Sequence, residues 1–223
     1  MNKQGNTYTF LYSVILVVVV AALLSIVSLS LQPRQDENRQ NEKRQNILSA
    51  IHIASTAETS AELFNKYIKE QFILNAKGEK IEGKAFDIDI AKEYKKAANE
   101  RELPVFVASV NDTTKYILPI YGAGLWGPIW GYISLDENKT TVYGTFFDHS
   151  GETPGLGAEI TTPKFNEPFK GKEIFSGEQL TSIRIIKGGN ASGSNEVDAI
   201  SGGTITSQGV EAMLKNYLTY YEP

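Results

Sequence analysis

The sequence predicts an α+β protein with one N-terminal transmembrane helix, followed by a soluble domain in which a twisted antiparallel sheet or partial barrel packs against helices. Three features of the 223 residues indicate this fold class. An apolar run covers residues 10–31, short β-branched and aromatic segments follow one another closely after residue 105, and an amphipathic helix is expected near the C-terminus. Closely spaced strands favour antiparallel pairing, because parallel strands need long crossover connections.

The N-terminal segment is long enough to cross a bilayer. Residues 4–33 carry no charge, and the apolar run Phe10–Leu31 exceeds the roughly 20 residues that a spanning helix needs. A cleaved signal peptide also has a polar head and an apolar stretch, but no small-x-small site ends this run cleanly. We therefore expect a retained anchor over residues 1–33, which leaves about 190 residues for a soluble body with a core of its own.

Charges beside the anchor favour a cytoplasmic soluble body. Lys3 precedes the span, whereas Arg34, Arg39, Lys43 and Arg44 follow it, interleaved with acidic residues. Lys and Arg accumulate on the cytoplasmic side of membrane helices, so this count alone places the soluble body inside the cell.

Residues 34–104 are expected to form a juxtamembrane linker and a lobe of helices and strands. The polar segment 35–45 reads as the linker or as a solvated first helical turn, and Ser55 and Glu58 have the spacing of a capping box before a helix. A turn is expected at Asn75–Gly78. The other expected elements are helices at Asn46–Ile53, Glu58–Lys69 and Ala91–Arg101, and a strand at Gln71–Asn75.

Residues 105–223 are expected to form the main domain. The predicted strands are Val105–Val110, Lys115–Ile120, Ile129–Leu135, Thr141–Asp148 and Ser182–Lys187. The C-terminal helix places Val210, Met213, Leu214, Tyr217 and Leu218 on one apolar face. Thr206 or Ser207 is its expected N-cap, and Trp130 is expected in the core.

The composition excludes several classes of site. The chain has no cysteine, which removes disulfides, zinc–thiolate sites and iron–sulfur ligation. It has two histidines, and His52 is expected to be a packing or surface residue, so we predict no metal site. The net charge of −4 argues against nucleic acid as a partner.

The loop 198–207 holds the most informative pattern in the chain. Gly202 and Gly203 allow positive φ and close approach of a bulky group, and four hydroxyl residues lie within the same span. The N-terminus of the following helix favours an anion near Thr204, such as a phosphate. A simple capped loop would show the same spacing. The Lys-Ser/Thr ending of a P-loop is missing, and Ile205 replaces the first glycine of a G-x-S-x-G elbow around Ser207.

The sequence Asp198-x-x-Ser201-Gly202-Gly203-Thr204 resembles the flavinylation motif of FMN-binding domains. In that family a dedicated transferase joins FMN by a phosphoester to the threonine hydroxyl. The family usually has alanine at the position of Gly203.

Further segments extend the resemblance to the NqrC family, which provides one subunit of the Na⁺-translocating NADH:quinone reductase. They are GAGLWGPIWG at 122–131, HSGETPGLGAE at 149–159 and KGG at 187–189, in this order behind one membrane helix. The tryptophans of the first segment favour this family over its relative RnfG, the corresponding subunit of the Rnf electron-transport complex. The resemblance covers the anchor and residues 105–223.

The resemblance implies a covalent FMN on Thr204 and a set of surrounding contacts. Leu125 and Trp126 would face the flat ring, Glu152 and Thr153 would meet a polar ring edge, and Lys187 would supply a cation near the phosphate or the ring. Thr204 would be a tether, and no catalytic side chain is predicted. The implied cofactor-binding residues are Thr204, Asp198, Ser201, Gly202, Gly203, Ser207, Leu125, Trp126, Glu152, Thr153, Leu156, Gly157 and Lys187.

The resemblance implies a membrane-anchored electron carrier that relays electrons from NADH toward quinone within a multi-subunit, Na⁺-translocating complex. Its implied partners are a NADH-oxidising flavoprotein and iron–sulfur subunit, a membrane flavin subunit and an FMN transferase. It also implies a bacterial inner membrane location with the soluble body on the periplasmic side, against the charge count. The chain has no G-x-G-x-x-G fingerprint after a strand and no ionisable residue in its span, so NADH and Na⁺ should be handled by partners.

Two alternatives remain open at this point. One is the equivalent flavin subunit of an Rnf-type complex that uses ferredoxin as the electron donor. The other is a non-redox, membrane-tethered interaction module with a degenerate flavin pocket.

Overall fold

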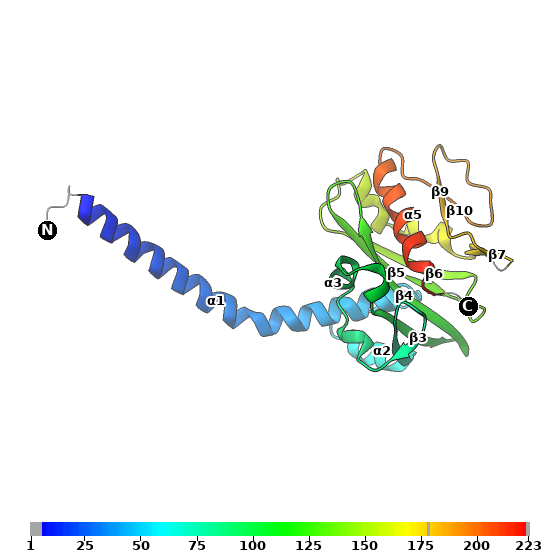
Figure 1. The fold of residues 1–223 in the computed structure, drawn as a ribbon, viewed down its shortest axis with the longest axis horizontal. Helices are drawn as coiled ribbons and strands as arrows, with labels where there is room; N and C mark the ends of the chain where they lie inside the picture. The colour runs from blue at the N-terminus through cyan, green and yellow to red at the C-terminus, as the bar shows by residue number, and fades with distance from the viewer. Residues whose placement is uncertain (1–5, 178, 222–223) are drawn as a thin grey trace. The chain divides into compact units, whose positions relative to one another are not determined.

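The computed structural model describes residues 6–177 and 179–221 (Figure 1). These residues divide into two compact units between Lys43 and Arg44, and the second unit begins at Arg44. The expected boundaries at residues 33 and 104 stay predictions. Strands from both sides of residue 104 pair in one sheet of the second unit.

Helix α1 (Asn6–Ser49) carries the apolar segment. It is long and apolar enough to cross a membrane, with a mean hydropathy of 3.0 over its most apolar window. Residues 35–45 are helical, and the helix expected at Asn46–Ile53 is not a separate element but the end of α1, which stops at Ser49. The polar residues after Pro33 are mostly good helix formers, so they extend a helix that has already begun.

A left-handed turn ends α1. His52 has φ 60°, and the Ile53 amide donates to the Leu48 carbonyl at 3.0 Å, as in a Schellman motif. This turn places Ile47, Leu48 and Ile51 in the core of the second unit with no exposed surface.

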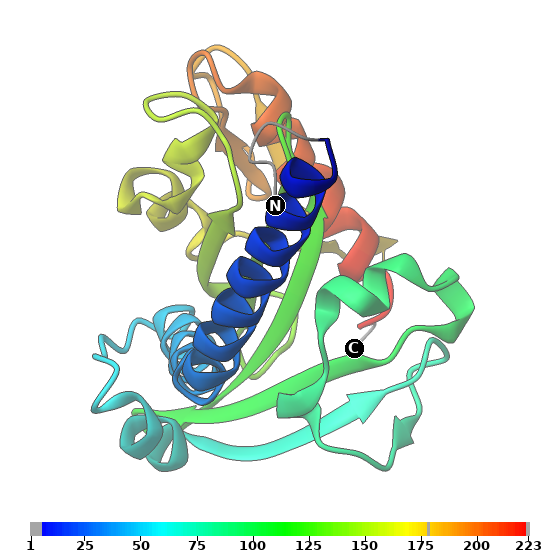
Figure 2. The same ribbon diagram turned by 90° about the vertical axis from the view of Figure 1, so that its left-hand side faces the viewer.

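The second unit is built on a twisted six-stranded sheet whose pairs are all antiparallel (Figures 1 and 2). This confirms the predicted fold class, with an open sheet instead of a partial barrel. The strand order is β2–β1–β3–β4–β5–β6. The strands are β1 (Ile68–Leu74), β2 (Lys80–Ile81), β3 (Leu103–Val110), β4 (Thr113–Ala123), β5 (Pro128–Leu135) and β6 (Val142–His149).

Alternating residues of the sheet feed two hydrophobic cores. Val105 and Leu118 join the core that holds helix α5 (Thr204–Leu218), whereas Phe106 and Ile117 join the core that holds the end of α1 and helix α2 (Ser60–Tyr67). Successive side chains of a strand point to opposite faces, so one sheet separates the two cores. Both faces are therefore covered.

Two predicted helices are shorter than expected. Helix α2 begins at Ser60, so the capping box at Ser55 and Glu58 does not form; a turn closed by Thr56 and Thr59, whose hydroxyl accepts from the Thr56 amide at 2.9 Å, precedes the helix instead. Helix α3 (Ile90–Lys95) is capped by Asp89 and ends before extended backbone at Lys96. Short 3₁₀ turns flank it at Ala85–Asp87 and Ala98–Glu100. The predicted Asn75–Gly78 turn is confirmed by the Gly78 amide donating to the Asn75 carbonyl at 2.9 Å.

The segment between β6 and α5 is folded from short elements. They are the 3₁₀ turns Gly157–Thr161 and Glu167–Phe169, α4 (Pro163–Asn166), β7 (Phe175–Ser176), β8 (Gln179–Leu180), β9 (Arg184–Ile186) and β10 (Glu196–Asp198). Strands β9 and β10 pair in parallel and form a small sheet of their own. The predicted strand Ser182–Lys187 is thus shorter and lies outside the main sheet.

Trp130, expected in the core, is half-buried on β5.

Three phenylalanines fix this segment to the sheet. Phe169 is fully buried, and its ring centroid lies 5.2 Å from that of Phe147 on β6 and 5.4 Å from that of Phe165 on α4. We expect Phe169→Ala to lower the free energy of unfolding by about 3–5 kcal/mol, because it removes buried apolar surface and leaves a cavity. Urea denaturation of the chain in detergent, followed by tryptophan fluorescence, measures this change.

Phe169→Leu should cost less, since it fills part of the cavity. A loss of under about 1 kcal/mol for Phe169→Ala would contradict the role of this cluster.

Candidate functional site

Three segments that are distant in sequence meet at a pocket of about 380 Å³ at the N-terminal end of α5. They are the loop between β4 and β5, the loop after β6, and the first turn of α5 with the residues before it. The lining residues are Leu125, Trp126, Glu152, Thr153, Leu156, Gly157, Gly202, Gly203, Thr204, Ile205 and Thr206. Nine of the residues predicted from sequence are among them, so the fold brings most of the predicted site together.

Glu152 joins the three segments. Glu152 is only 4% exposed, and its carboxylate accepts from the Trp126 amide at 2.8 Å and from the Thr206 hydroxyl at 2.6 Å. Its own amide donates to Nδ1 of His149 at 3.2 Å. Hydrogen bonds to a charged group contribute about 1.5–3 kcal/mol each, more than neutral ones. This one side chain therefore holds the β4–β5 loop and helix α5 to the loop after β6.

Two glycines make room for this carboxylate. A Cβ added at Gly124 would collide with one Glu152 oxygen, and a Cβ added at Gly157 would collide with the other and with the Thr206 hydroxyl. Glycine at these two positions thus allows three chain segments to approach one buried acid.

Helix α5 begins earlier than predicted. Gly203 is its N-cap and Thr204 its first residue, so the expected cap at Thr206 or Ser207 is wrong. Both hydroxyls have other partners: that of Thr206 donates to Glu152, while that of Ser207 donates to the Gly203 carbonyl and accepts from the Ile200 amide at 3.1 Å. Ser207 is fully buried, so it holds the loop from behind and does not line the pocket.

The half-buried Thr204 side chain stands where the helix N-terminus opens into the pocket. First-turn amides of a helix lack intrahelical partners and carry the positive end of the dipole, which favours an anion here by about 0.3–1 kcal/mol. The backbone turns sharply just before the helix, where Gly202 has φ 76°. Residues with a side chain rarely adopt this backbone conformation. A phosphate group suits this position.

Apolar side chains surround the same opening. Leu125, Trp126, Leu156 and Ile205 are 48%, 69%, 42% and 55% exposed. Among the residues that the structure describes, they are the exposed large hydrophobic side chains outside α1. Such a cluster on an otherwise polar surface indicates a binding site. Their size and the adjacent anion site fit a ligand with a flat aromatic ring and a phosphate, as FMN has.

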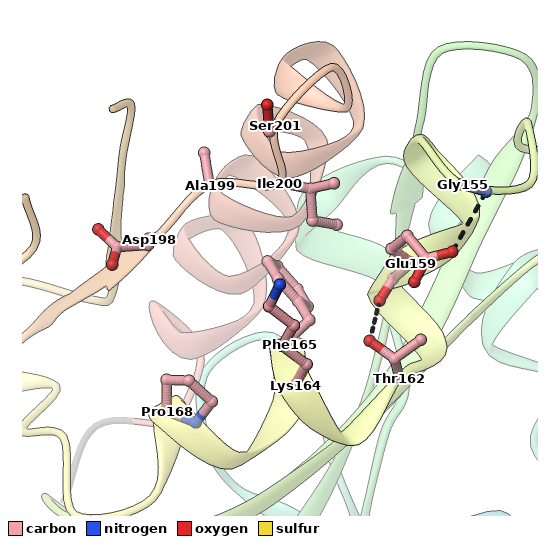
Figure 3. Close-up of a pocket in the computed structure, with 10 residues that line it drawn as sticks. All are labelled: Gly155, Glu159, Thr162, Lys164, Phe165, Pro168, Asp198, Ala199, Ile200 and Ser201. Carbon is pink, nitrogen blue, oxygen red and sulfur yellow. Dashed lines mark hydrogen bonds between the residues drawn. The ribbon is translucent and has the colours of Figure 1, made fainter. Parts of the chain in front are cut away.

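The other predicted residues lie elsewhere. Asp198 and Ser201 belong to the lining of a second groove, and Lys187 is an exposed residue directly after β9 that lines neither cavity. Figure 3 shows the Asp198 and Ser201 side chains directed away from Phe165. The Asp198 carboxylate accepts from the Ala191 amide at 2.8 Å. In the same loop, the Gly193 and Ser192 amides lower the pKa of the Glu196 carboxyl. The loop beyond Lys187 is therefore tied to β10.

Two residues that line the pocket, Ile205 and Thr206, are not among the cofactor contacts predicted from the sequence. The local pattern suggests a helix cap for Thr206, whereas its partner is Glu152, a pairing across 54 positions that no local pattern reveals. Ile205 could have been found, because it is an apolar residue outside the apolar stripe of α5. In the described part of the chain no group of three or more potential metal-binding side chains occurs.

We expect Glu152→Ala to release the pocket loop. Trp126 loses its acceptor and the Thr206 hydroxyl is left buried without one, so the free energy of unfolding should fall by about 2–4 kcal/mol. Hydrogen exchange at the Trp126 amide should also become faster, which mass spectrometry measures.

The isosteric variant Thr206→Val is the matched control. It removes one partner of the carboxylate and should leave the Trp126 amide protected. Unchanged exchange at Trp126 in Glu152→Ala would contradict the joining role of Glu152.

Comparison with known proteins agrees with this site. Residues 124–219, which include all three pocket segments, match the FMN-binding domain family. The chain is 31% identical to the NqrC subunit of the Na(+)-translocating NADH-quinone reductase of Haemophilus ducreyi, over 96% of this chain and 90% of the relative. It is 33% identical to the same subunit of Yersinia pestis, over 94% and 87%.

A solved structure gives the same result. The crystal structure of the same reductase subunit from Parabacteroides distasonis aligns with a TM-score of 0.80 at 49% identity, covering 86% of this chain and 94% of that one. These similarities select the sodium-translocating reductase over the Rnf-type alternative. The chain therefore belongs to the NqrC family of Na(+)-translocating NADH-quinone reductase subunits, flavoproteins that carry an FMN-binding domain.

Proposed function

We propose that this chain carries FMN as a phosphoester on Thr204 and relays electrons within a membrane-bound NADH:quinone reductase. The observation that supports this most strongly is the coincidence at one opening of a half-buried threonine, a helix N-terminus and a cluster of exposed apolar side chains. A simple capped loop would account for the helix start but not for the apolar cluster.

Different groups of the pocket would bind the ring and the phosphate of FMN. Trp126, Leu125, Leu156 and Ile205 would cover the apolar faces of the ring. The first-turn amides of α5 would bind the phosphate, whose remaining negative charge suits the helix dipole. Bound FMN would supply a ring that accepts and donates electrons singly. Glu152 would keep the Trp126 loop in place and exclude water from beneath the ring.

The predicted roles of three residues are more indirect. Asp198 and Ser201 would shape the loop and not touch the ring, since they line a different groove. Lys187 stays a prediction as a cation near the cofactor. It follows β9 and precedes two glycines with positive φ, so its position depends on that exposed turn.

An external transferase is the proposed source of the bond. In residues 6–177 and 179–221 no carboxylate or imidazole accepts a hydrogen bond from the Thr204 hydroxyl, whereas the neighbouring Thr206 hydroxyl donates to Glu152. A threonine hydroxyl needs such activation before it attacks phosphorus. The chain would therefore be modified by another protein and would not modify itself.

A covalently attached flavin is suited to an electron carrier. A carrier of single electrons does not release its cofactor between turnovers, so a covalent bond prevents loss of the flavin without slowing the reaction. We propose that a NADH-oxidising flavoprotein and iron–sulfur subunit and a membrane flavin subunit exchange electrons with it, and that these partners handle NADH and Na⁺.

We expect Thr204→Val to abolish covalent flavin. After co-expression with a flavin transferase, the unmodified chain should give a fluorescent band on a denaturing gel and gain the mass of one FMN less one water. The variant should give neither, because it keeps the shape of threonine without the hydroxyl. Thr219→Val, at the other end of α5, is the matched control and should remain fluorescent.

A variant that keeps its fluorescence would contradict attachment at Thr204. An unmodified chain that gains no flavin at all would favour the non-redox interaction module.

We further propose that the soluble body faces the periplasm, although the basic residues after the anchor favour the opposite orientation. Because the chain has no cysteine, a single Lys77→Cys change in the exposed β1–β2 turn provides a clean label site. A membrane-impermeant maleimide should label this variant in intact cells with a permeable outer membrane. Labelling only after the inner membrane is lysed would contradict the periplasmic orientation.

A further inference from the structure

Among the described residues that line the pocket at the start of α5, Glu152 is the one with an ionisable side chain. The other lining side chains are apolar or carry a hydroxyl, and the remainder are glycine. The carboxylate that joins the three pocket segments therefore also determines the charge of the pocket wall.

The joining role alone does not require a charge. A glutamine of the same size could hold the same two segments, because its carbonyl could accept from the Trp126 amide and its amide could donate to the Thr206 hydroxyl. In this chain both oxygens of Glu152 accept, Oε1 from the Trp126 amide and Oε2 from the Thr206 hydroxyl. Neither oxygen needs a proton of its own for these contacts, so the side chain is an anion.

No cation of the described residues offsets this negative charge. None of the ion pairs within residues 6–177 and 179–221 includes Glu152. The imidazole of His149 contacts the backbone of Glu152, but its Nδ1 accepts the Glu152 amide proton at 3.2 Å, which leaves the ring neutral. Lys187 is exposed and does not line the pocket. The positive end of α5 is directed to the proposed phosphate, whose own charge it offsets.

The surroundings of Glu152 keep its charge effective at short range. The residue is only 4% exposed, so water and salt screen the carboxylate poorly. Leu125, Trp126 and Leu156 line the same pocket and would exclude water once a ring is bound. Charges interact more strongly in such a medium than in water.

We propose that the Glu152 carboxylate lowers the reduction potential of the bound flavin, which rests on the proposed function. When one electron passes from a donor subunit to the ring, the donor is oxidised, the ring gains one negative charge, and no bond forms or breaks. A like charge in the pocket wall makes this gain less favourable. A charge within about 4–6 Å changes a neighbouring protonation equilibrium by about tenfold to a thousandfold, and the same Coulomb interaction acts on an added electron.

The consequence is a flavin that gives up its electron more readily. A lower reduction potential makes the reduced ring a stronger reductant toward the next carrier. Glu152 would therefore favour onward transfer to an acceptor over storage of the electron on this subunit.

Three variants separate the charge of Glu152 from its structural role. Glu152→Gln removes the charge and keeps the size of the side chain. Thr206→Val keeps the charge and removes one hydrogen bond to it. Glu82→Gln removes an exposed charge just after β2, far in sequence from the pocket segments, and is the matched control.

The measurement is a redox titration of the attached flavin. The 223-residue chains are co-expressed with a flavin transferase and purified in detergent. Each is titrated with dithionite beside a reference dye of known potential at pH 7, and the oxidised and reduced ring are followed by absorbance.

At a fixed potential, we expect Glu152→Gln to raise the ratio of reduced to oxidised flavin at least tenfold for one electron, a rise of about 59 mV in midpoint potential. Glu82→Gln should keep the original ratio. Thr206→Val should keep or lower it, because the carboxylate retains its charge and loses a donor. An unchanged or lower ratio in Glu152→Gln would overturn the proposal. An equal rise in Thr206→Val would also overturn it, since loosening of the pocket would then explain both.

Glu152→Leu gives the same reading if Glu152→Gln carries too little flavin to titrate. Loss of flavin from both variants would overturn the inference, because Glu152 would then be needed to hold the cofactor and not to set its potential. Failure of the unmodified chain to acquire flavin would instead overturn the proposed function itself, and this inference with it.

Discussion

The architecture of the site depends on one buried carboxylate. Glu152 accepts hydrogen bonds from the Trp126 amide and the Thr206 hydroxyl, and so ties the β4–β5 loop and the start of α5 to the loop after β6. An acid that is 4% exposed would be costly to bury without such donors. Glycines at 124 and 157 leave space for its two oxygens. The pocket is therefore shaped by a polar interaction beneath it, while its visible walls are apolar.

Three neighbouring parts of the site present chemically different surfaces. The first turn of α5 offers amides to an anion, the apolar rim offers surface to a ring, and the segment before the helix is presented on the opposite side of the loop. Ser207, which donates to the Gly203 carbonyl and accepts from the Ile200 amide, fixes the loop between these faces.

Local patterns predicted much of this architecture, and non-local contacts explain the remainder. The period-two strands and the apolar stripe of α5 could be read because each depends on a few neighbouring residues. The linker after Pro33 could not be distinguished from helix, since Gln, Arg, Glu and Lys suit both a solvated loop and an exposed helical turn. The helix N-cap was misplaced because the Thr206 hydroxyl is directed to Glu152, 54 positions earlier. The family resemblance groups Asp198 and Ser201 with the flavin contacts, whereas both line the second groove, and their part in the flavin site stays a prediction.

We propose that the pocket around Trp126 and Thr204 holds the flavin. The most direct test is a crystal structure of the flavin-loaded chain, with the electron density examined before any ligand is built. We expect a ring against Trp126 and Leu156, with density continuous through a phosphate to Oγ of Thr204. A ring in the groove between Glu159 and Ser201, or density that ends short of Thr204, would contradict the account.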